Sequence, residues 1–129
     1  MRSLVAEDDA TNRLLLKSFL SRYGECDVAL NGKQAVEAVN TARQRSCAYD
    51  LVCMDLGMPE LDGQLAIREI RKHESIDGAL KATRIIVTTA HSDMESITTA
   101  LLGRCDAYLV KPINIGKLSH ELKKLGLVA

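Results

Sequence analysis

Short apolar runs alternate along the chain with longer segments in which apolar residues recur at helical spacing. Runs of four or five apolar residues, bounded by Gly, Asn or Asp, are typical of buried β-strands. We predict strands at Ser3–Ala6, Cys26–Leu30, Leu51–Met54, Ile85–Thr88 and Ala107–Val110.

A helix is predicted after each strand, because residues three and four positions apart share one helical face. The apolar faces span Leu14–Leu20, Ala35–Ala42, Leu65–Ile70, Ile97–Leu102 and Leu118–Leu125. Gly24 is expected to end the first helix, and Asn31-Gly32 to form a turn before the second. Arg71 falls on the outward face of the third helix, and the polar segment 73–84 is either the tail of that helix or a loop.

The alternation of strands and helices predicts the fold class. Strands that are apolar throughout are covered on both faces, which is typical of a parallel sheet with right-handed helical crossovers. We therefore predict a doubly wound α/β fold of five β-α units. With 129 residues, the chain is expected to form one domain over positions 1–129, with no output domain.

Composition narrows the function classes. Lys+Arg and Asp+Glu balance at 17 each, so the chain lacks the basic field that would favour direct binding to nucleic acid or to a membrane. No apolar stretch reaches the roughly 18 residues of a membrane span. The cysteines form no CxxC pair and are expected to be buried free thiols of a soluble, cytoplasmic protein: Cys26, Cys47, Cys53 and Cys105.

Polar residues of the types that catalyse reactions or bind metal ions stand where the predicted strands end. The carboxyl ends of parallel strands meet at one edge of a sheet, so these residues are expected to converge on one pocket. They are Glu7, Asp8 and Asp9 after the first strand, Asp55 after the third, Thr88 and Thr89 after the fourth, and Lys111 after the fifth.

Such a cluster predicts a metal-assisted phosphoryl acceptor. Neighbouring carboxylates cannot all ionise without a compensating cation, and ligands that are only oxygens favour Mg²⁺, with Mn²⁺ as a substitute. Lys111 would add a second positive charge and Thr89 a hydroxyl donor. With these groups around it, Asp55 has what a carboxylate needs to become an aspartyl phosphate.

Each residue also has a plainer interpretation. Asp9 alone is best explained as a helix N-cap, since a cap needs only one acceptor. Asp8 and Asp55 taken singly could be turn residues, and Lys111 a surface lysine. Their joint occurrence after several strands favours the phosphoryl site.

The chain resembles bacterial response-regulator receiver domains from about Leu4 to Leu125. The motifs that carry the resemblance are Leu4-Val5-Ala6-Glu7-Asp8, Asn31-Gly32, Asp55-Leu56-Gly57-Met58-Pro59-Glu60-Leu61-Asp62-Gly63, Thr89-Ala90 and Tyr108-Leu109-Val110-Lys111-Pro112. The resemblance implies a flavodoxin-like strand order, 2-1-3-4-5. This order is common among doubly wound α/β folds, and a member of the same family is a standard example of it.

The resemblance also implies the chemistry of the site. Asp55 would accept a phosphoryl group from a phosphohistidine on a sensor histidine kinase or a histidine phosphotransfer domain. Metal ligands would be Asp8 and Asp55 directly, Glu7 through water and the backbone carbonyl of Gly57. Lys111 would contact the phosphoryl group, so the chain would catalyse its own phosphorylation and dephosphorylation without being a metabolic enzyme.

The resemblance further implies a conformational switch. Thr89 would close on the phosphoryl group and let Tyr108 move inward. The surface of the fourth helix, fifth strand and fifth helix would then change, and family members use it to dock targets or to form homodimers. The Lys111-Pro112 bond is cis in the family. Gly57 and His91 occupy positions that tune the lifetime of the phosphoryl group, so the sequence leaves that lifetime open.

Three other functions compete with this one. A flavodoxin-like redox carrier needs a phosphate-binding loop where this chain has carboxylates. A haloacid-dehalogenase-type phosphatase would have a second Asp where Gly57 stands. A pseudo-receiver would serve as a constitutive interaction module.

Two motifs indicate which kind of protein carries such a domain. Ala6-Glu7-Asp8 and Asn12-Arg13 most resemble receivers of hybrid histidine kinases, with a stand-alone regulator as the alternative.

Overall fold

The predicted parallel sheet is confirmed, with strands in the order β2-β1-β3-β4-β5. The computed structural model describes residues 1–58, 62–79, 81–90 and 104–129. All pairings between neighbouring strands are parallel. The strands are β1 (Ser3–Ala6), β2 (Cys26–Ala29), β3 (Leu51–Asp55), β4 (Arg84–Thr89) and β5 (Ala107–Val110).

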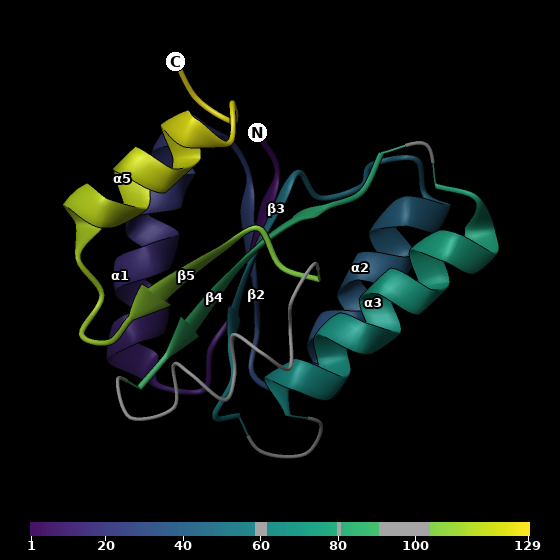
Figure 1. Ribbon diagram of the computed structural model, residues 1–129, viewed down its shortest axis with the longest axis horizontal. Helices are drawn as coiled ribbons and strands as arrows, with labels where there is room; N and C mark the ends of the chain where they lie inside the picture. The colour runs from purple at the N-terminus through teal and green to yellow at the C-terminus, as the bar shows by residue number, and fades with distance from the viewer. Residues whose placement is uncertain (59–61, 80, 91–103) are drawn as a thin grey trace.

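Helices cover both faces of the sheet, as expected for a doubly wound fold. They are α1 (Ala10–Leu20), α2 (Gly32–Gln44), α3 (Gly63–Asp77) and α5 (Ile115–Lys124), with a short 3₁₀ helix at Ser21–Tyr23. Helices α1 and α5 lie on one side of the sheet, and α2 and α3 lie on the other (Figure 1). The helix predicted at 97–102 lies outside the described residues.

Two apolar clusters, one on each face of the sheet, explain why the strands are apolar throughout. Side chains alternate between faces along a strand, so Val5 packs in one cluster and Leu4 and Ala6 pack in the other. The same alternation separates Cys53 from Met54 in β3. Each face is covered by two of the described helices, which keep water from the strands.

Strand register brings the predicted site residues to one edge of the sheet. Asp55 pairs with Thr88, and Thr89 pairs with Val110, which directly precedes Lys111. The Lys111 amide donates to the carbonyl oxygen of Thr89 over 2.8 Å, which extends the ladder to the lysine itself. The carboxyl ends of β1, β3, β4 and β5 therefore face a common space.

Helix boundaries differ from the sequence prediction in two places. Helix α1 ends at Leu20 and not at Gly24, which instead follows the 3₁₀ turn with φ of 146°. The segment 73–84 divides between the two alternatives: α3 continues to Asp77, where Gly78 in the left-handed conformation caps it, and the described residues from there to β4 are not helical.

Gly63 is required at the start of α3 for a steric reason. Its φ is not positive, but a Cβ at this position would lie 2.5 Å from the carbonyl oxygen of Asp55. Only glycine lets the first turn of α3 approach the end of β3 this closely. The requirement is therefore steric, and it places α3 beside the pocket.

Arg71 does not point freely outward as its helical position predicts. Its guanidinium donates to the carbonyl oxygens of Arg104 and Thr83 and pairs with the buried Glu74 carboxylate at 2.8 Å. It also pairs with Asp106 at 3.4 Å. Arg71 thus ties α3 to the segments that lead into β4 and β5, the strands that carry Thr89 and Lys111.

The cysteines differ in exposure. All four cysteines are free thiols; Cys26 and Cys53 are buried, whereas Cys47 and Cys105 are only half-buried. Within the described residues, no helix combines the length and the apolar character that crossing a membrane requires.

Candidate functional site

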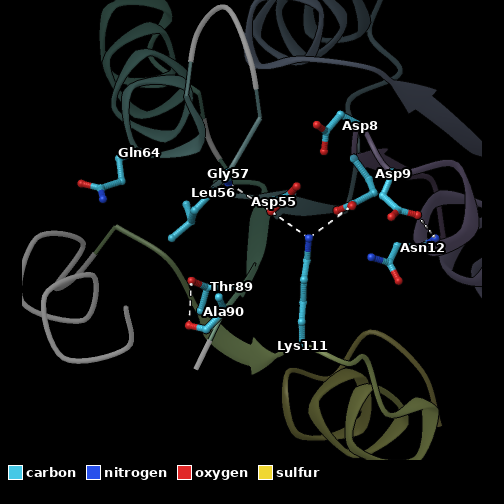
Figure 2. A pocket seen from close by; sticks show the side chains of 11 residues that line it. Asp8, Asp9, Asn12, Asp55, Leu56, Gly57, Gln64, Thr89, Ala90 and Lys111 are labelled. Atoms are coloured by element: carbon cyan, nitrogen blue, oxygen red, sulfur yellow. Dashed lines mark hydrogen bonds and ion pairs between the residues drawn. The ribbon is translucent and has the colours of Figure 1, made fainter. Parts of the chain in front are cut away.

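The residues predicted at the strand ends line one pocket of about 620 Å³ (Figure 2). The lining comprises Glu7, Asp8, Asp9, Asn12, Asp55, Leu56, Gly57, Gln64, Thr89, Ala90 and Lys111. Its polar groups come from the ends of four strands and from the first turns of α1 and α3. The pocket lies where parallel α/β sheets bind their ligands.

Lys111 stands between two carboxylates. Its Nζ lies 3.1 Å from Asp55 Oδ1 and 3.2 Å from Glu7 Oε1. The lysine side chain extends from the end of β5 into the carboxylate cluster (Figure 2). Burial opposes its charge, but hydrogen bonding and attraction to Asp55 and Glu7 outweigh that effect and raise the pKa of Lys111. The lysine is therefore a fixed positive charge in the pocket. The bond between Lys111 and Pro112 is cis, as the resemblance implied.

Glu7 is fully buried, with 0% of its surface exposed. Burial, followed by repulsion from Asp55, raises the pKa of its carboxyl above the ordinary value, despite the nearby lysine. Its Oε2 is buried without a hydrogen-bond partner among the described residues. A buried oxygen without a partner is costly, and this one calls for a cation or a proton.

The carboxylates are arranged so that one ion can contact them. Glu7, Asp8 and Asp55 each offer an oxygen, and these oxygens lie within 4.8 Å of one another. Asp8 is exposed, whereas Glu7 and Asp55 are buried. Three carboxylate oxygens at this spacing fit a hard divalent cation.

Glu7 should make the stability of the metal-free protein depend on pH. The pKa of Glu7 is raised on folding, so its contribution is fully present below the ordinary value of 4.5 and is lost as the pH rises through the raised value. We expect Glu7→Gln to melt higher than the metal-free wild type at pH 7, by about 4 °C for each ~1 kcal/mol. The gain should vanish at pH 4. Thermal melts in chelator test this, and an equal difference at both pH values would contradict it.

Asp55 is the last residue of β3 and is 3% exposed. Its Oδ1 accepts the amide of Gly57 over 3.1 Å and faces Lys111. A Cβ at Gly57 would lie 3.8 Å from that same oxygen, an ordinary contact distance. Gly57 therefore leaves space open beside the carboxylate, space that a larger side chain would fill.

Asp9 lines the pocket but works as a cap, as its plainer interpretation predicted. Its side chain accepts the amides of Thr11 and Asn12 at 2.8 and 3.0 Å, which satisfies the first turn of α1. Its carboxylate is therefore engaged with the helix, unlike those of Glu7, Asp8 and Asp55.

The two predicted switch residues are placed differently. Thr89 ends β4, is 3% exposed and lines the pocket, where its hydroxyl donates to the carbonyl oxygen of Ala90 over 3.4 Å. Tyr108 lies in β5, is half-buried and packs against the cluster beneath α2 and α3, away from the pocket lining. His91 lies outside the described residues.

Sequence reasoning did not assign Asn12, Gln64 or Arg13 to the site. Asn12 and Gln64 are at opposite ends of the pocket (Figure 2). Arg13 lies behind it and donates from Nη1 to the carbonyl oxygens of Glu7 and Asp8, at 3.1 and 3.3 Å. The hints in the sequence were its place in the Asn12-Arg13 motif and its position one turn into the helix, which many surface arginines share.

Comparison with known proteins agrees with the geometry. The family model described as response regulator receiver domain matches residues 4–123. Hybrid signal transduction histidine kinase G of Dictyostelium discoideum is 34% identical over 129 residues, a match that covers 98% of this chain but 4% of that protein. The chain thus corresponds to a small part of this much longer relative.

Solved receiver domains have the same fold. The receiver domain of Ssk1 from Saccharomyces cerevisiae, in a co-crystal with the histidine phosphotransfer signaling protein Ypd1, has a TM-score of 0.83 and 30% identity; the match covers 98% of this chain and 89% of that one. The receiver domain of the histidine kinase CKI1 from Arabidopsis thaliana, complexed with Mg²⁺ and BeF₃⁻, has a TM-score of 0.82 and 25% identity, with coverage of 98% and 90%.

Proposed function

The chain belongs to the response regulator receiver domain family, and from this premise we propose that Asp55 accepts a phosphoryl group from a partner's phosphohistidine in a phosphorelay. The observation that supports this most is the position of Lys111 Nζ, within 3.2 Å of both Asp55 and Glu7. A nucleophile, a fixed cation and a cation-binding carboxylate set share one pocket. Phosphoryl transfer requires this combination.

Mg²⁺ is the ion that we propose for the carboxylates, with Mn²⁺ as a substitute. Asp8, Asp55 and the backbone carbonyl of Gly57 would hold it directly, and Glu7 through water. Bound there, the ion supplies positive charge against the phosphoryl oxygens. The Mg²⁺ and BeF₃⁻ complex of the CKI1 receiver domain supports the choice.

Asp55 has one oxygen available for attack. Oδ1 is engaged by the Gly57 amide and Lys111, and no hydrogen bond to Oδ2 occurs among the described residues. We assign the attack to Oδ2: its bond to phosphorus forms as the P–N bond of phosphohistidine breaks, and the electron pair returns to the imidazole nitrogen, which takes up a proton. Lys111 would compensate the negative charge of the phosphoryl oxygens.

The proposed output is a change of surface. Thr89 lines the pocket, and among the described residues its hydroxyl bonds only the adjacent carbonyl of Ala90, a long contact that it can exchange for a phosphoryl oxygen. Tyr108 packs on the neighbouring strand and would respond to that movement. The phosphoryl group can shift this equilibrium only by its difference in affinity for the two arrangements. Target docking and homodimer formation on this surface are the expected consequences.

A donor protein must cover the pocket, and α1, which begins at the pocket, carries exposed apolar side chains. Leu14 is 67% exposed, and Leu15 and Ile115 line an apolar groove between α1 and α5. Helix α1 also contributes Asn12 to the pocket. We therefore place the phosphohistidine donor against α1 and the start of α5. The co-crystal of the Ssk1 receiver domain with the histidine phosphotransfer protein Ypd1 supports the class of donor.

Leu14→Asp should separate docking from chemistry. With a phosphorylated histidine phosphotransfer protein that is active on the wild type, we expect transfer to slow about 10-fold or more, because a charge replaces an interface anchor. With acetyl phosphate the rate should be unchanged. Ile76→Asp is the matched control, since Ile76 is 68% exposed in the last turn of α3, at the opposite end of the helix from Gln64, which lines the pocket. Equal losses in both variants would contradict the docking site.

Intact-mass measurement after incubation with acetyl phosphate and Mg²⁺ tests the proposed function. We expect a gain of one phosphoryl group that chelation prevents and that is lost again through the protein's own phosphatase activity. No gain with any donor would favour the pseudo-receiver. The redox alternative is disfavoured by carboxylates at the pocket, because Glu7, Asp8 and Asp55 would repel a flavin phosphate.

A further inference from the structure

We propose that Arg13 is a positioning residue for the metal ligands Glu7 and Asp8, an inference that rests on the proposed function. Arg13 belongs to α1 and is half-buried. Its Nη1 donates to the carbonyl oxygens of both residues, at 3.1 Å to Glu7 and 3.3 Å to Asp8. It therefore contacts the backbone of the ligands and not their carboxylates.

Arg13 contacts the middle of the acidic loop, residues 7–9, between two ends that other hydrogen bonds hold in place. At one end of the loop, the Glu7 amide donates to the carbonyl oxygen of Ala29 over 3.1 Å. At the other end, Asp9 is held as the N-cap of α1. Among the described residues, the carbonyls of Glu7 and Asp8 between these anchors accept hydrogen bonds only from Arg13.

The orientation of those two peptide units decides where the ligand side chains point. Glu7 is buried and Asp8 is exposed, yet both must offer oxygens within 4.8 Å of each other and of Asp55. Successive residues of an extended chain send their side chains to opposite sides, so convergence requires a specific local turn. Arg13 stabilises that turn by binding both carbonyls from behind the pocket.

Charge and positioning predict opposite effects of removing Arg13. If the guanidinium acted only as a nearby positive charge, its removal would reduce repulsion and tighten Mg²⁺ binding. If it positions the ligands, its removal weakens Mg²⁺ binding, as loss of outer contacts to metal ligands commonly does by about 10–100-fold. The sign of the change therefore distinguishes the two roles.

The experiment measures the Mg²⁺ dissociation constant of the full chain by calorimetry and by the amide shifts of Glu7 to Asp9, alongside the melting temperature in chelator. We expect Arg13→Met to weaken binding about 10-fold and Arg13→Lys, which keeps a donor, to recover part of the loss. Lys17→Met is the matched control: it removes one positive charge from the exposed face of the same helix, one turn further on. Its binding should be equal to wild type or tighter.

Three results would overturn the inference. The first is tighter Mg²⁺ binding by Arg13→Met, which indicates a role of charge alone. The second is an unchanged dissociation constant, which together with a lower melting temperature in chelator indicates a purely structural role. If Arg13→Met does not fold, Arg13→Gln replaces it with the same expectation. The third is a wild type that binds no Mg²⁺, which overturns the proposed function as well, whereas the first two leave that function standing.

Discussion

Asp55→Asn is expected to abolish the mass gain from acetyl phosphate and Mg²⁺. An amide oxygen is a poor nucleophile, and the substitution also removes one of the carboxylates that would attract the ion. The two side chains have nearly the same shape, so Asn fits the 3% exposed site without a cavity. Lys111 keeps Glu7 as its partner, so the fold should survive.

The matched control is Asp9→Asn, which changes the same functional group in the same pocket. Asn caps helices as well as Asp does, so α1 should be unaffected and phosphorylation should persist. Intact mass over a time course, with a melting curve for each variant, reports both chemistry and folding. Phosphorylation of Asp55→Asn at the wild-type rate, or its loss in Asp9→Asn instead, would reassign the acceptor.

Lys111→Met should change metal binding and transfer in opposite directions. Lys111 lies 3.1 Å from Asp55 and 3.2 Å from Glu7, so its charge competes with Mg²⁺ for the same carboxylates. Without it we expect Mg²⁺ to bind about 10-fold more tightly, which corresponds to ~1.4 kcal/mol. Phosphorylation at saturating Mg²⁺ should nevertheless slow about 100-fold, because a preorganised donor to the phosphoryl oxygens is lost.

Lys117→Met provides the control for charge alone. Lys117 is exposed in α5, six residues further along the chain, and its side chain has no hydrogen bond to the described residues. Calorimetry gives the Mg²⁺ dissociation constant and the mass time course gives the rate. If Lys111→Met weakened Mg²⁺ binding, or left the rate of transfer unchanged, the role assigned to the lysine would be wrong.

The sequence predicted the fold because its pattern is strong. Strands that are apolar throughout occur where both faces are covered, and the structure covers both with helices. The boundaries were less predictable. The end of α1 at Leu20 and the tail of α3 to Asp77 depend on caps and on tertiary contacts that periodicity does not report.

Arg71 illustrates what a helical pattern misses. Its position is outward by periodicity, yet it binds Glu74, Thr83 and the segment before β5. A long side chain reaches groups that are distant in sequence, and those partners become available only after the strands align. Tyr108 likewise belongs to the expected strand, but only the structure places it outside the pocket lining.

The amino-acid sequence by itself determined the alternation of elements and the placement of Glu7, Asp55, Thr89 and Lys111 at strand ends, because side-chain periodicity and chain direction follow from local order. Only the tertiary structure decided that Lys111 lies between Glu7 and Asp55, a contact across 104 positions of sequence. It also decided that Glu7 is buried while Asp8 is exposed, and that Arg13 holds both from behind. Such contacts depend on strand register and side-chain rotamers, which are selected when distant segments pack together.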